Sequence, residues 1–416
     1  MMKKLVISGA MILAASTAYA ATTATNVVTT LTKGVTVLTA PAKPTVSGVT
    51  NLAGNAVTLG TDPVPGAVTK GLAIGQGQLA GFVSNFDVKS LLIPSWGSGE
   101  AAPSGRPDVV GAFRFICQPG HVLRDDPIVF PGQPGKSHLH QFFGNTTANA
   151  FSTYGSLRVK GDSTCNNMLN RSAYWIPAML DGKGKVVRPD YVSIYYKRLP
   201  ASDPNCQIIA KACVALPRGM RYVFGYNMAT GESAHFYFDC NGPTGVSGHF
   251  PDIVTAAKGC PVGNRLGAVI NGPDCWDGRN LNSTDHRKHV SYGGYGSIGR
   301  YHCPSSHPYM IPAFTLGAWY EVDKNLDTSG EWAPGTSTWS LASDAMPGMP
   351  VMRPGSTLHG DWLGAWDDGV MQMWMENCIN KLLTCNGGDL GNGLQMKGRP
   401  DFSWNATPRL VDIPAA

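Results

Sequence analysis

The chain has 416 residues, only 15% of them charged, and its formal net charge is +5. It contains no run of five or more lysines and arginines, which argues against nucleic acid as a partner. Fifty glycines and thirty prolines favour strands and turns over long helices.

The first twenty residues have the pattern of a secretory signal peptide. Lys3 and Lys4 precede an apolar run from Leu5 to Ala15, and Ala18-Tyr19-Ala20 is a small-x-small cleavage site. The run is shorter than the ~20 residues that a membrane-spanning helix needs. We therefore predict a secreted, periplasmic or cell-surface protein with no transmembrane segment after signal cleavage.

Residues 21–81 differ in composition from the rest of the chain. They are rich in Thr, Val, Gly and Ala, and they contain no aromatic residue, cysteine or histidine. Because such a segment lacks the large side chains that build a core, we interpret it as a low-complexity tether. A small β-rich spacer is the alternative, since valine and threonine favour strands.

Residues 82–416 have the composition of one large globular domain, with its core at about residues 107–385. We predict a β-rich α+β fold with long loops, few helices and several disulfides. Strands are expected at residues 191–197, 221–226 and 235–239, which are rich in aromatic residues and valine. One helix is expected near the end, capped by Asp367 or Asp368. Apolar residues recur there every four positions as far as Leu382.

Ten cysteines fall between Cys117 and Cys385. An even number in an exported chain indicates disulfides, so up to five bridges are expected. The connectivity is left open, although Cys206 and Cys213 are near enough in sequence to close a small loop, as are Cys378 and Cys385. A structural zinc site is a weaker alternative because no C-x-x-C pair occurs.

All ten histidines lie between His121 and His359, and several fall in short clusters beside acids. In the first cluster, His138-x-His140, both imidazoles would lie on the same face of an extended strand and could meet one metal or one substrate. Asp126 precedes them on the same stretch. The alternative is one hydrogen-bonded core histidine and one surface histidine.

The second cluster is Asp285-His286-x-x-His289. On a helical turn, residues i and i+3 share a face, so the two histidines could converge, and Asp285 could orient an imidazole. Trp276 and Asp277 lie just upstream. A solvated turn is the alternative, because Arg287 and Lys288 stand between the histidines.

The third cluster is His359-Gly-Asp361-Trp362. His-x-Asp is part of the pattern of a 2-His-1-carboxylate iron site. Trp362 and Trp366 suit a cleft in which indole rings stack on sugar rings, although packing in the core is the more frequent role of tryptophan.

Seven segments in series resemble a family of secreted proteins catalogued as a domain of unknown function, DUF1996. They are DPIVFPG at 126–132, SHLHQFFG at 137–144, SAYWIP at 172–177, CWDGRNLN at 275–282, DHRKHV at 285–290, CPSSHP at 303–308 and HGDWLGAW at 359–366. The resemblance covers about residues 107–385 and implies an extracellular, polysaccharide-associated setting. The chain departs from the family in one respect, because Cys165 stands alone where other members often carry a close cysteine pair.

Three functions follow as hypotheses. The first is a carbohydrate-active hydrolase or lyase acting on a cell-wall or extracellular polysaccharide through a His/Asp site. The second is a metal-binding protein holding copper, zinc or iron, and the third is a non-catalytic glycan-binding module. A divalent metal is the candidate cofactor. The candidate catalytic residues are Asp126, His138, His140, Asp277, Asp285, His286 and Asp361. The candidate substrate-binding residues are Trp175, Trp276, Arg279, Trp362 and Trp366. The candidate metal ligands are His138, His140, His289 and His359.

Overall fold

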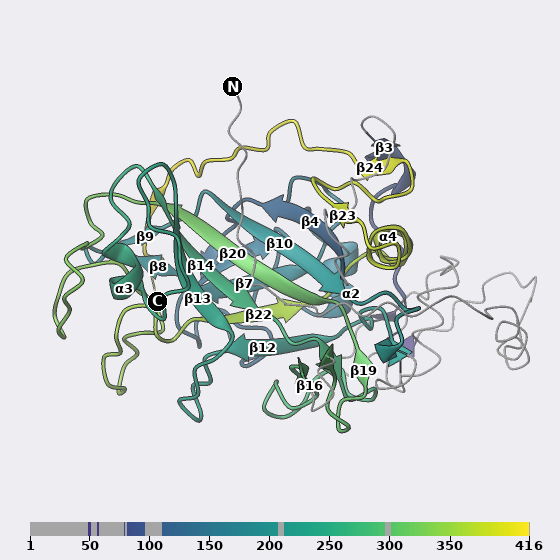
Figure 1. Cartoon of the computed structure of the whole chain (residues 1–416), viewed down its shortest axis with the longest axis horizontal. Helices are drawn as coiled ribbons and strands as arrows, with labels where there is room; N and C mark the ends of the chain where they lie inside the picture. The colour runs from purple at the N-terminus through teal and green to yellow at the C-terminus, as the bar shows by residue number, and fades with distance from the viewer. Residues whose placement is uncertain are drawn as a thin grey trace, which may run out of the picture. The chain divides into compact units, whose positions relative to one another are not determined.

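The computed structural model describes residues 49–50, 56–57, 79, 81–95, 110–206, 212–295 and 301–415, all of which belong to one unit, Gly48–Ala416. The predicted signal peptide and most of the predicted tether lie outside the described residues. Two sheets of mainly antiparallel strands form the centre of the domain (Figure 1). The fold is the predicted β-rich α+β type, with short helices and long loops.

The larger sheet has six strands in the order β13-β14-β20-β10-β4-β23. All neighbours are antiparallel except β23, which runs parallel to β4. The predicted strands at 191–197 and 235–239 are confirmed as β10 and β13. The bounds are β4 Gly111–Cys117, β10 Tyr191–Arg198, β13 Phe236–Asn241, β14 Arg265–Asn271, β20 Ala313–Glu321 and β23 Thr384–Cys385.

The second sheet has five antiparallel strands in the order β12-β22-β7-β6-β5. It includes the strand that was predicted at 221–226. The bounds are β5 Val122–Leu123, β6 His140–Gly144, β7 Ala173–Pro177, β12 Arg221–Gly225 and β22 His359–Leu363.

The two sheets pack face to face through a core of aromatic side chains. Phe314 of β20 contacts Tyr174 of β7, Phe224 of β12 and Trp362 of β22, with ring centroids 5.3–5.7 Å apart. Side chains alternate between the two faces of a strand, so every second residue of β7, β12 and β22 enters this core. The residues between them point to the opposite face of the five-stranded sheet.

Smaller elements surround the two sheets. The described residues include three α-helices, α2 Tyr154–Val159, α3 Ile253–Ala257 and α4 Asp368–Trp374, together with a 3₁₀ turn at Lys89–Leu91. Two four-stranded sheets have the orders β11-β19-β15-β16 and β21-β8-β9-β25, and three two-stranded pairs are β1-β2, β17-β18 and β24-β3. Their bounds are β1 Val49–Thr50, β2 Ala56–Val57, β3 Leu92–Pro94, β8 Met179–Leu180, β9 Lys185–Val187, β11 Ala212–Cys213, β15 Cys275–Trp276, β16 Val290–Ser291, β17 Gly294–Tyr295, β18 Tyr301–His302, β19 Tyr309–Met310, β21 Ser340–Leu341, β24 Leu394–Met396 and β25 Leu410–Asp412.

The helix predicted near the end of the chain begins where expected and ends earlier. Asp367 is its N-cap, and its carboxylate accepts from the backbone N–H of Gly369 and Val370. α4 continues into a π-helical turn, Met375–Ile379, and the expected position Leu382 lies beyond its end. The chain must leave the helix there because Thr384 and Cys385 pair with β4, and Cys385 is bonded to Cys378.

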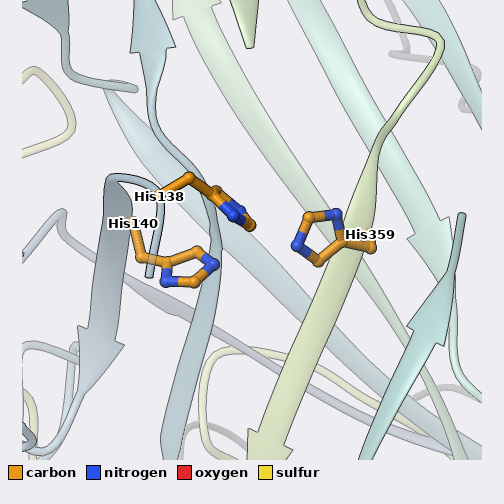
Figure 2. A group of neighbouring side chains, drawn as sticks. All are labelled: His138, His140 and His359. Carbon is orange, nitrogen blue, oxygen red and sulfur yellow. The ribbon is translucent and has the colours of Figure 1, made fainter. Parts of the chain in front are cut away.

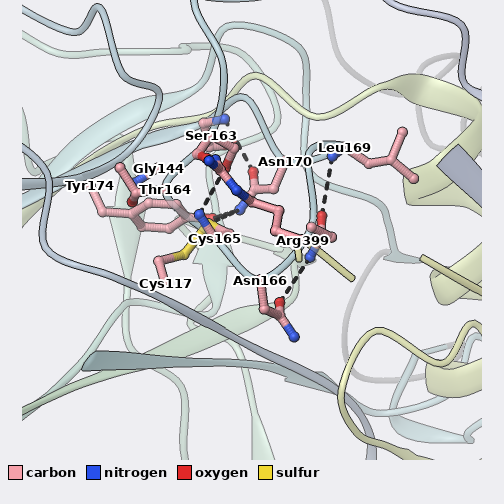
Figure 3. Close-up of a disulfide and its surroundings, with 12 residues drawn as sticks. Cys117, Gly144, Ser163, Thr164, Cys165, Asn166, Leu169, Asn170, Tyr174 and Arg399 are labelled. Atoms are coloured by element: carbon pink, nitrogen blue, oxygen red, sulfur yellow. Dashed lines mark hydrogen bonds between the residues drawn. A yellow bond between two sulfur atoms is a disulfide. The ribbon is translucent and has the colours of Figure 1, made fainter. Parts of the chain in front are cut away.

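All ten cysteines form disulfides, as the sequence predicted: Cys117–Cys165, Cys206–Cys213, Cys240–Cys260, Cys275–Cys303 and Cys378–Cys385. Cys165, which stands alone before the Tyr-Trp motif, reaches back to Cys117 at the end of β4 (Figure 3). This bridge closes a loop of 48 residues. Within the described residues, no helix is both long enough and apolar enough to cross a membrane.

Candidate functional site

The outer face of the five-stranded sheet carries apolar residues at one end and a polar cluster at the other. Phe142, Trp175, Val223 and Leu363 form the apolar part and are covered by residues of the 128–157 segment. On β22, His359 and Asp361 alternate with Gly360 and Trp362, so both polar side chains point to this outer face while Trp362 enters the core.

Three imidazoles meet at this polar end. The ring centroids of His138 and His140 are 4.2 Å apart, those of His138 and His359 5.0 Å, and those of His140 and His359 5.9 Å. His140 begins β6 and His138 lies in the bend before it, while His359 begins β22. Figure 2 shows the three rings turned toward a common space. One ring nitrogen of each lies within 4.8 Å of the others.

Main-chain carbonyls fix the orientation of two of these rings. The Nδ1–H of His140 donates to the carbonyl oxygen of Asp125 (2.9 Å), and the Nδ1–H of His359 donates to that of Thr357 (2.9 Å). A carbonyl can only accept, so the proton is held on Nδ1 and the lone pair lies on Nε2. The buried Nε2 atoms of His138 and His140 have no hydrogen-bond partner. The arrangement therefore presents unprotonated nitrogens toward one point.

Two carboxyl groups adjoin the imidazoles. Asp126 and Asp361 each place an oxygen within 4.8 Å of a ring nitrogen of His140 and of each other. Asp126 accepts from the backbone N–H of Ile128 (2.8 Å) and Val129 (2.9 Å), which holds it in a tight turn. Asp361 is fully buried between Trp175 and Val223 on the neighbouring strands, and neither of its oxygens has a hydrogen-bond partner.

Burial controls the ionisation of this cluster because it penalises every charged form. It lowers the pKa of His140 to about 3 and that of His359 to about 4, and it lowers the pKa of His138 well below the usual value. Burial, followed by the negative charge of Asp126, raises the pKa of Asp361 well above its ordinary range. At neutral pH the imidazoles are consequently uncharged, which is the form that binds metals.

The 285–290 segment lies in turns, and its histidines stay outside the cluster. Both ring nitrogens of His289 are occupied, Nδ1 by the hydroxyl of Ser283 (3.0 Å) and Nε2 by the carbonyl oxygen of Arg221 (2.9 Å). His286 instead contacts the side chain of Asn282 (3.0 Å). The expected convergence of the two histidines required a helical turn, whereas His286 adopts a positive φ of 59°.

Asp285 and Asp277 shape turns at a distance from the imidazole cluster. Asp285 accepts from the Ser283 hydroxyl and from two backbone N–H groups. Burial raises the pKa of Asp285, but these hydrogen bonds together outweigh it and bring the pKa to about 2. Asp277 accepts from the backbone N–H of Arg279 and Asn280, and neither Asp277 nor Asp285 belongs to the carboxylate pair beside His140.

The four candidate sugar-binding tryptophans are packed inside the protein. Trp175, Trp276 and Trp362 are at most 1% exposed, and Trp366 is 4% exposed. Trp175 lies on the outer face of the five-stranded sheet under the 128–157 segment, whereas Trp276, Trp362 and Trp366 belong to the main core. Any surface on which a sugar stacks must be formed by other residues. Arg279, the remaining candidate, is exposed.

Two arginines that the sequence did not single out flank the cluster. Arg124 follows Leu123, which pairs with His140. Arg287 donates to the carbonyl oxygens of Gly225 (3.1 Å) and Tyr226 (2.7 Å), and Gly225 pairs with His359. Each arginine lies beside a group of residues that the sequence analysis had identified. Arg124 precedes Asp125-Asp126, and Arg287 stands between the two histidines of the second cluster.

The donor set fits a transition metal. Three neutral imidazoles with an adjacent carboxylate are the ligands that zinc, copper and iron accept, and the carbonyls of Asp125 and Thr357 supply the outer hydrogen bonds that usually orient metal-bound histidines. Three nitrogens on one zinc ion at 2.0–2.1 Å lie about 3.3 Å apart. The three nitrogens lie within 4.8 Å of one another, so they would have to move closer together to share one ion.

Comparison with known proteins identifies the family. No curated protein and no solved structure matches the chain. The family model described as "Domain of unknown function (DUF1996)" matches residues 126–366, a range that includes the three clustered histidines, both buried carboxyl groups and Arg287 but not Arg124. Because the match spans more than half of the chain, this protein belongs to the DUF1996 family.

Proposed function

We propose that this protein is a metal-dependent enzyme whose centre is the group His138, His140 and His359. The observation that carries the proposal is the pair of Nδ1–H bonds to main-chain carbonyls, which leaves Nε2 of His140 and His359 free to bind the same ion. Unpaired buried nitrogens cost free energy, and a bound metal removes that cost. A single divalent first-row ion is the expected cofactor.

Asp361 gives this centre a proton acceptor. Burying a carboxyl group without a hydrogen-bond partner is unfavourable, so its retention beside three imidazoles suggests a role in chemistry or metal binding. A divalent metal lowers the pKa of a bound water towards neutrality. In the metal-free protein the raised pKa of Asp361 favours its protonated form. The positive charge of a bound ion would lower that pKa, and the ionised Asp361 could then accept a proton from a water at the centre.

We also propose that the enzyme is exported and acts on an extracellular polysaccharide. Five disulfides are typical of proteins that fold in an oxidising compartment, and the sequence of residues 1–20 predicts a signal peptide. The polysaccharide-associated setting that the family resemblance implies supplies the substrate class. Mass spectrometry of the N-terminus of the exported protein tests the predicted start at Ala21.

Elemental mass spectrometry tests the metal centre. Protein purified from an oxidising compartment should contain close to one equivalent of metal, and His138→Ala should lose it. His138 is the suitable position because it is only partly buried and its Nε2 has no protein partner. His249→Ala is the matched control, since His249 is exposed and stacks on Tyr237 outside the cluster.

The result that would contradict the proposal is a folded, metal-free parent protein that takes up no metal on titration with zinc, copper or iron. Activity on a polysaccharide panel, measured with and without a chelator, then tests catalysis. Reducing ends and unsaturated products should both be measured, because they distinguish a hydrolase from a lyase.

A metal-free glycoside hydrolase is the second candidate, and one observation favours it. Asp126 and Asp361 have carboxyl oxygens within 4.8 Å of each other, and burial raises the pKa of both. Retaining glycosidases place two carboxyl groups about 5–5.5 Å apart, one of them with a raised pKa. Activity that survives complete metal removal and is lost in Asp361→Asn would favour this candidate.

A further inference from the structure

We propose that the centre takes a substrate group that carries negative charge, a uronate carboxylate or a sulfate or phosphate ester, bound between Arg124 and Arg287. This inference rests on the proposed function, because the metal adds to the same positive field. It names the class of polysaccharide, an anionic one, on which the enzyme would act.

Arg124 has donor capacity that the protein does not use. Its Nε–H is buried and has no hydrogen-bond partner among the described residues. The residue stands directly before Asp125, whose carbonyl orients His140, and after Leu123, which pairs with His140. The positive charge of Arg124 also acts on His138. A partly buried guanidinium with an unpaired N–H beside a metal centre is suited to a carboxylate or phosphate.

Arg287 approaches the cluster from the other strand edge. Its two terminal nitrogens donate to the carbonyl oxygens of Gly225 and Tyr226, which fixes the guanidinium next to the start of β22. A guanidinium has five N–H groups, so most of them stay available after these two bonds. Its charge acts on Asp361 and on His359.

Arg124 and Arg287 keep their positive charge available for a ligand. The carboxyl groups of Asp126 and Asp361 adjoin the candidate metal ligands, and a bound divalent ion would offset their negative charge. Among the described residues, neither arginine forms an ion pair with a carboxylate.

The other nearby acids use their oxygens elsewhere. Asp125 accepts from the backbone N–H groups of Gly135 and Ala150, and Asp285 accepts from its own turn. Glu232, which acts on Arg287, is exposed, so solvent screens its charge. Two positive charges are therefore left for a ligand.

The accessible side of the cluster is the side that carries these charges. His140 and Asp361 are fully buried, whereas His138, Arg124 and Arg287 are each partly exposed. A substrate that reaches the metal must then pass the partly exposed residues. An anionic group would be attracted along that path, and a neutral sugar would gain nothing from it.

Calorimetric titration with three probes tests the inference. Inorganic phosphate, D-galacturonate and D-galactose are titrated into protein whose metal content has been measured in the same sample. The two anions should bind and galactose should not. Stronger binding of galacturonate indicates a uronate-containing substrate, and stronger binding of phosphate indicates an ester-substituted one.

Arg124→Gln should weaken anion binding by about tenfold or more while the metal content stays unchanged, because a charge-assisted hydrogen bond is lost. Arg124 is the better test position, since Arg287 also holds two main-chain carbonyls. Lys324→Gln, which removes an exposed positive charge at a residue with no proposed role in the site, is the matched control and should bind the anions like the parent.

Metal-loaded protein that binds no anion, or binds it equally well as Arg124→Gln, would overturn this inference and leave the metal centre standing. Protein that takes up no metal would overturn the proposed function, and this inference with it.

Discussion

His140 and His359 lie on strands that are not neighbours, yet their ring centroids are only 5.9 Å apart. β7 runs between β6 and β22, and Pro177 at its end pairs with His140. Strands two positions apart in a sheet are separated by about 9.6 Å, so the rings must lean toward each other across β7. The site therefore depends on the register of three strands, since a slip of β22 by one residue would turn His359 and Asp361 into the core.

We expect Asp361→Asn to stabilise the metal-free protein by about 1–3 kcal/mol at pH 8, because it removes a buried carboxyl group that has no partner. The pKa of Asp361 is higher in the folded protein than in the unfolded chain. The folded protein therefore loses stability as the pH rises from the unfolded-state pKa to the folded-state pKa of this group. The stability gained by Asp361→Asn should therefore become smaller as the pH is lowered toward 5. Urea unfolding in the presence of a chelator measures both effects.

Asp277→Asn is the matched control for Asp361→Asn. The carboxylate of Asp277 accepts three hydrogen bonds in its turn, so its replacement should leave stability unchanged or lower it. A loss of stability in Asp361→Asn at pH 8 without metal would show that this carboxyl group has a partner.

In the Asp361→Asn background, we expect the metal-free protein to become more stable as pH rises from 4 to 6.5. His140 and His359 have folded-state pKa values of about 3 and about 4, below the value of 6.5 for a free histidine. The unfolded chain therefore binds more protons in this window, and stability increases with pH by up to about 1.4 kcal/mol per pH unit for each histidine. Adding His359→Asn should flatten the profile, and an unchanged slope would contradict the burial of a neutral His359.

Trp362→Ala should cost about 3–5 kcal/mol of unfolding free energy, because the ring fills the core against Tyr222 and Phe314. Trp362→Phe should cost less and stay folded. If Trp362 has only a packing role, the folded Phe variant should bind polysaccharide like the parent. Weaker polysaccharide binding by that variant, measured by affinity electrophoresis, would indicate that Trp362 contacts the sugar after all.

Removing the Cys117–Cys165 bridge by Cys117→Ala/Cys165→Ala should cost about 4 kcal/mol by the loop-entropy estimate for 48 residues. It should also weaken metal binding, because Asp126, His138 and His140 all lie inside the loop. Cys206→Ala/Cys213→Ala is the control, since it opens a loop of seven and should cost about 2 kcal/mol. Equal metal affinity in both double variants, measured by competition with a chromophoric chelator, would show that the 48-residue loop does not support the site.

Local patterns in the sequence were sufficient for the pair His138-x-His140 and for the strands rich in aromatic residues. The two imidazoles do meet, although only His140 lies on a strand and His138 stands in the bend before it. The disulfides of Cys206–Cys213 and Cys378–Cys385 were predictable because short separations leave the chain few other partners. The helix start at Asp367 followed from its capping side chain.

Tertiary structure decided which distant segments join His138 and His140. His359 and Asp361 reach them through the order β22-β7-β6, which brings together residues more than 200 positions apart. His286 and His289 carry the same chemical groups, but their turn directs Arg287 to the site and leaves His289 bound to Ser283 and Arg221. Backbone φ angles and hydrogen bonds to other strands set these directions, and neither is encoded in the spacing of histidines.

The sequence by itself determined the composition of the domain, its disulfide-bonded β-rich character and the residue types from which a polar site could be built. Only the tertiary structure determined the members of that site and the burial of the tryptophans. The physical reason is that a face of a strand becomes core or site according to what packs on it. That covering layer comes from the 124–160 segment and the 283–289 turn, whose positions depend on contacts far away in the sequence.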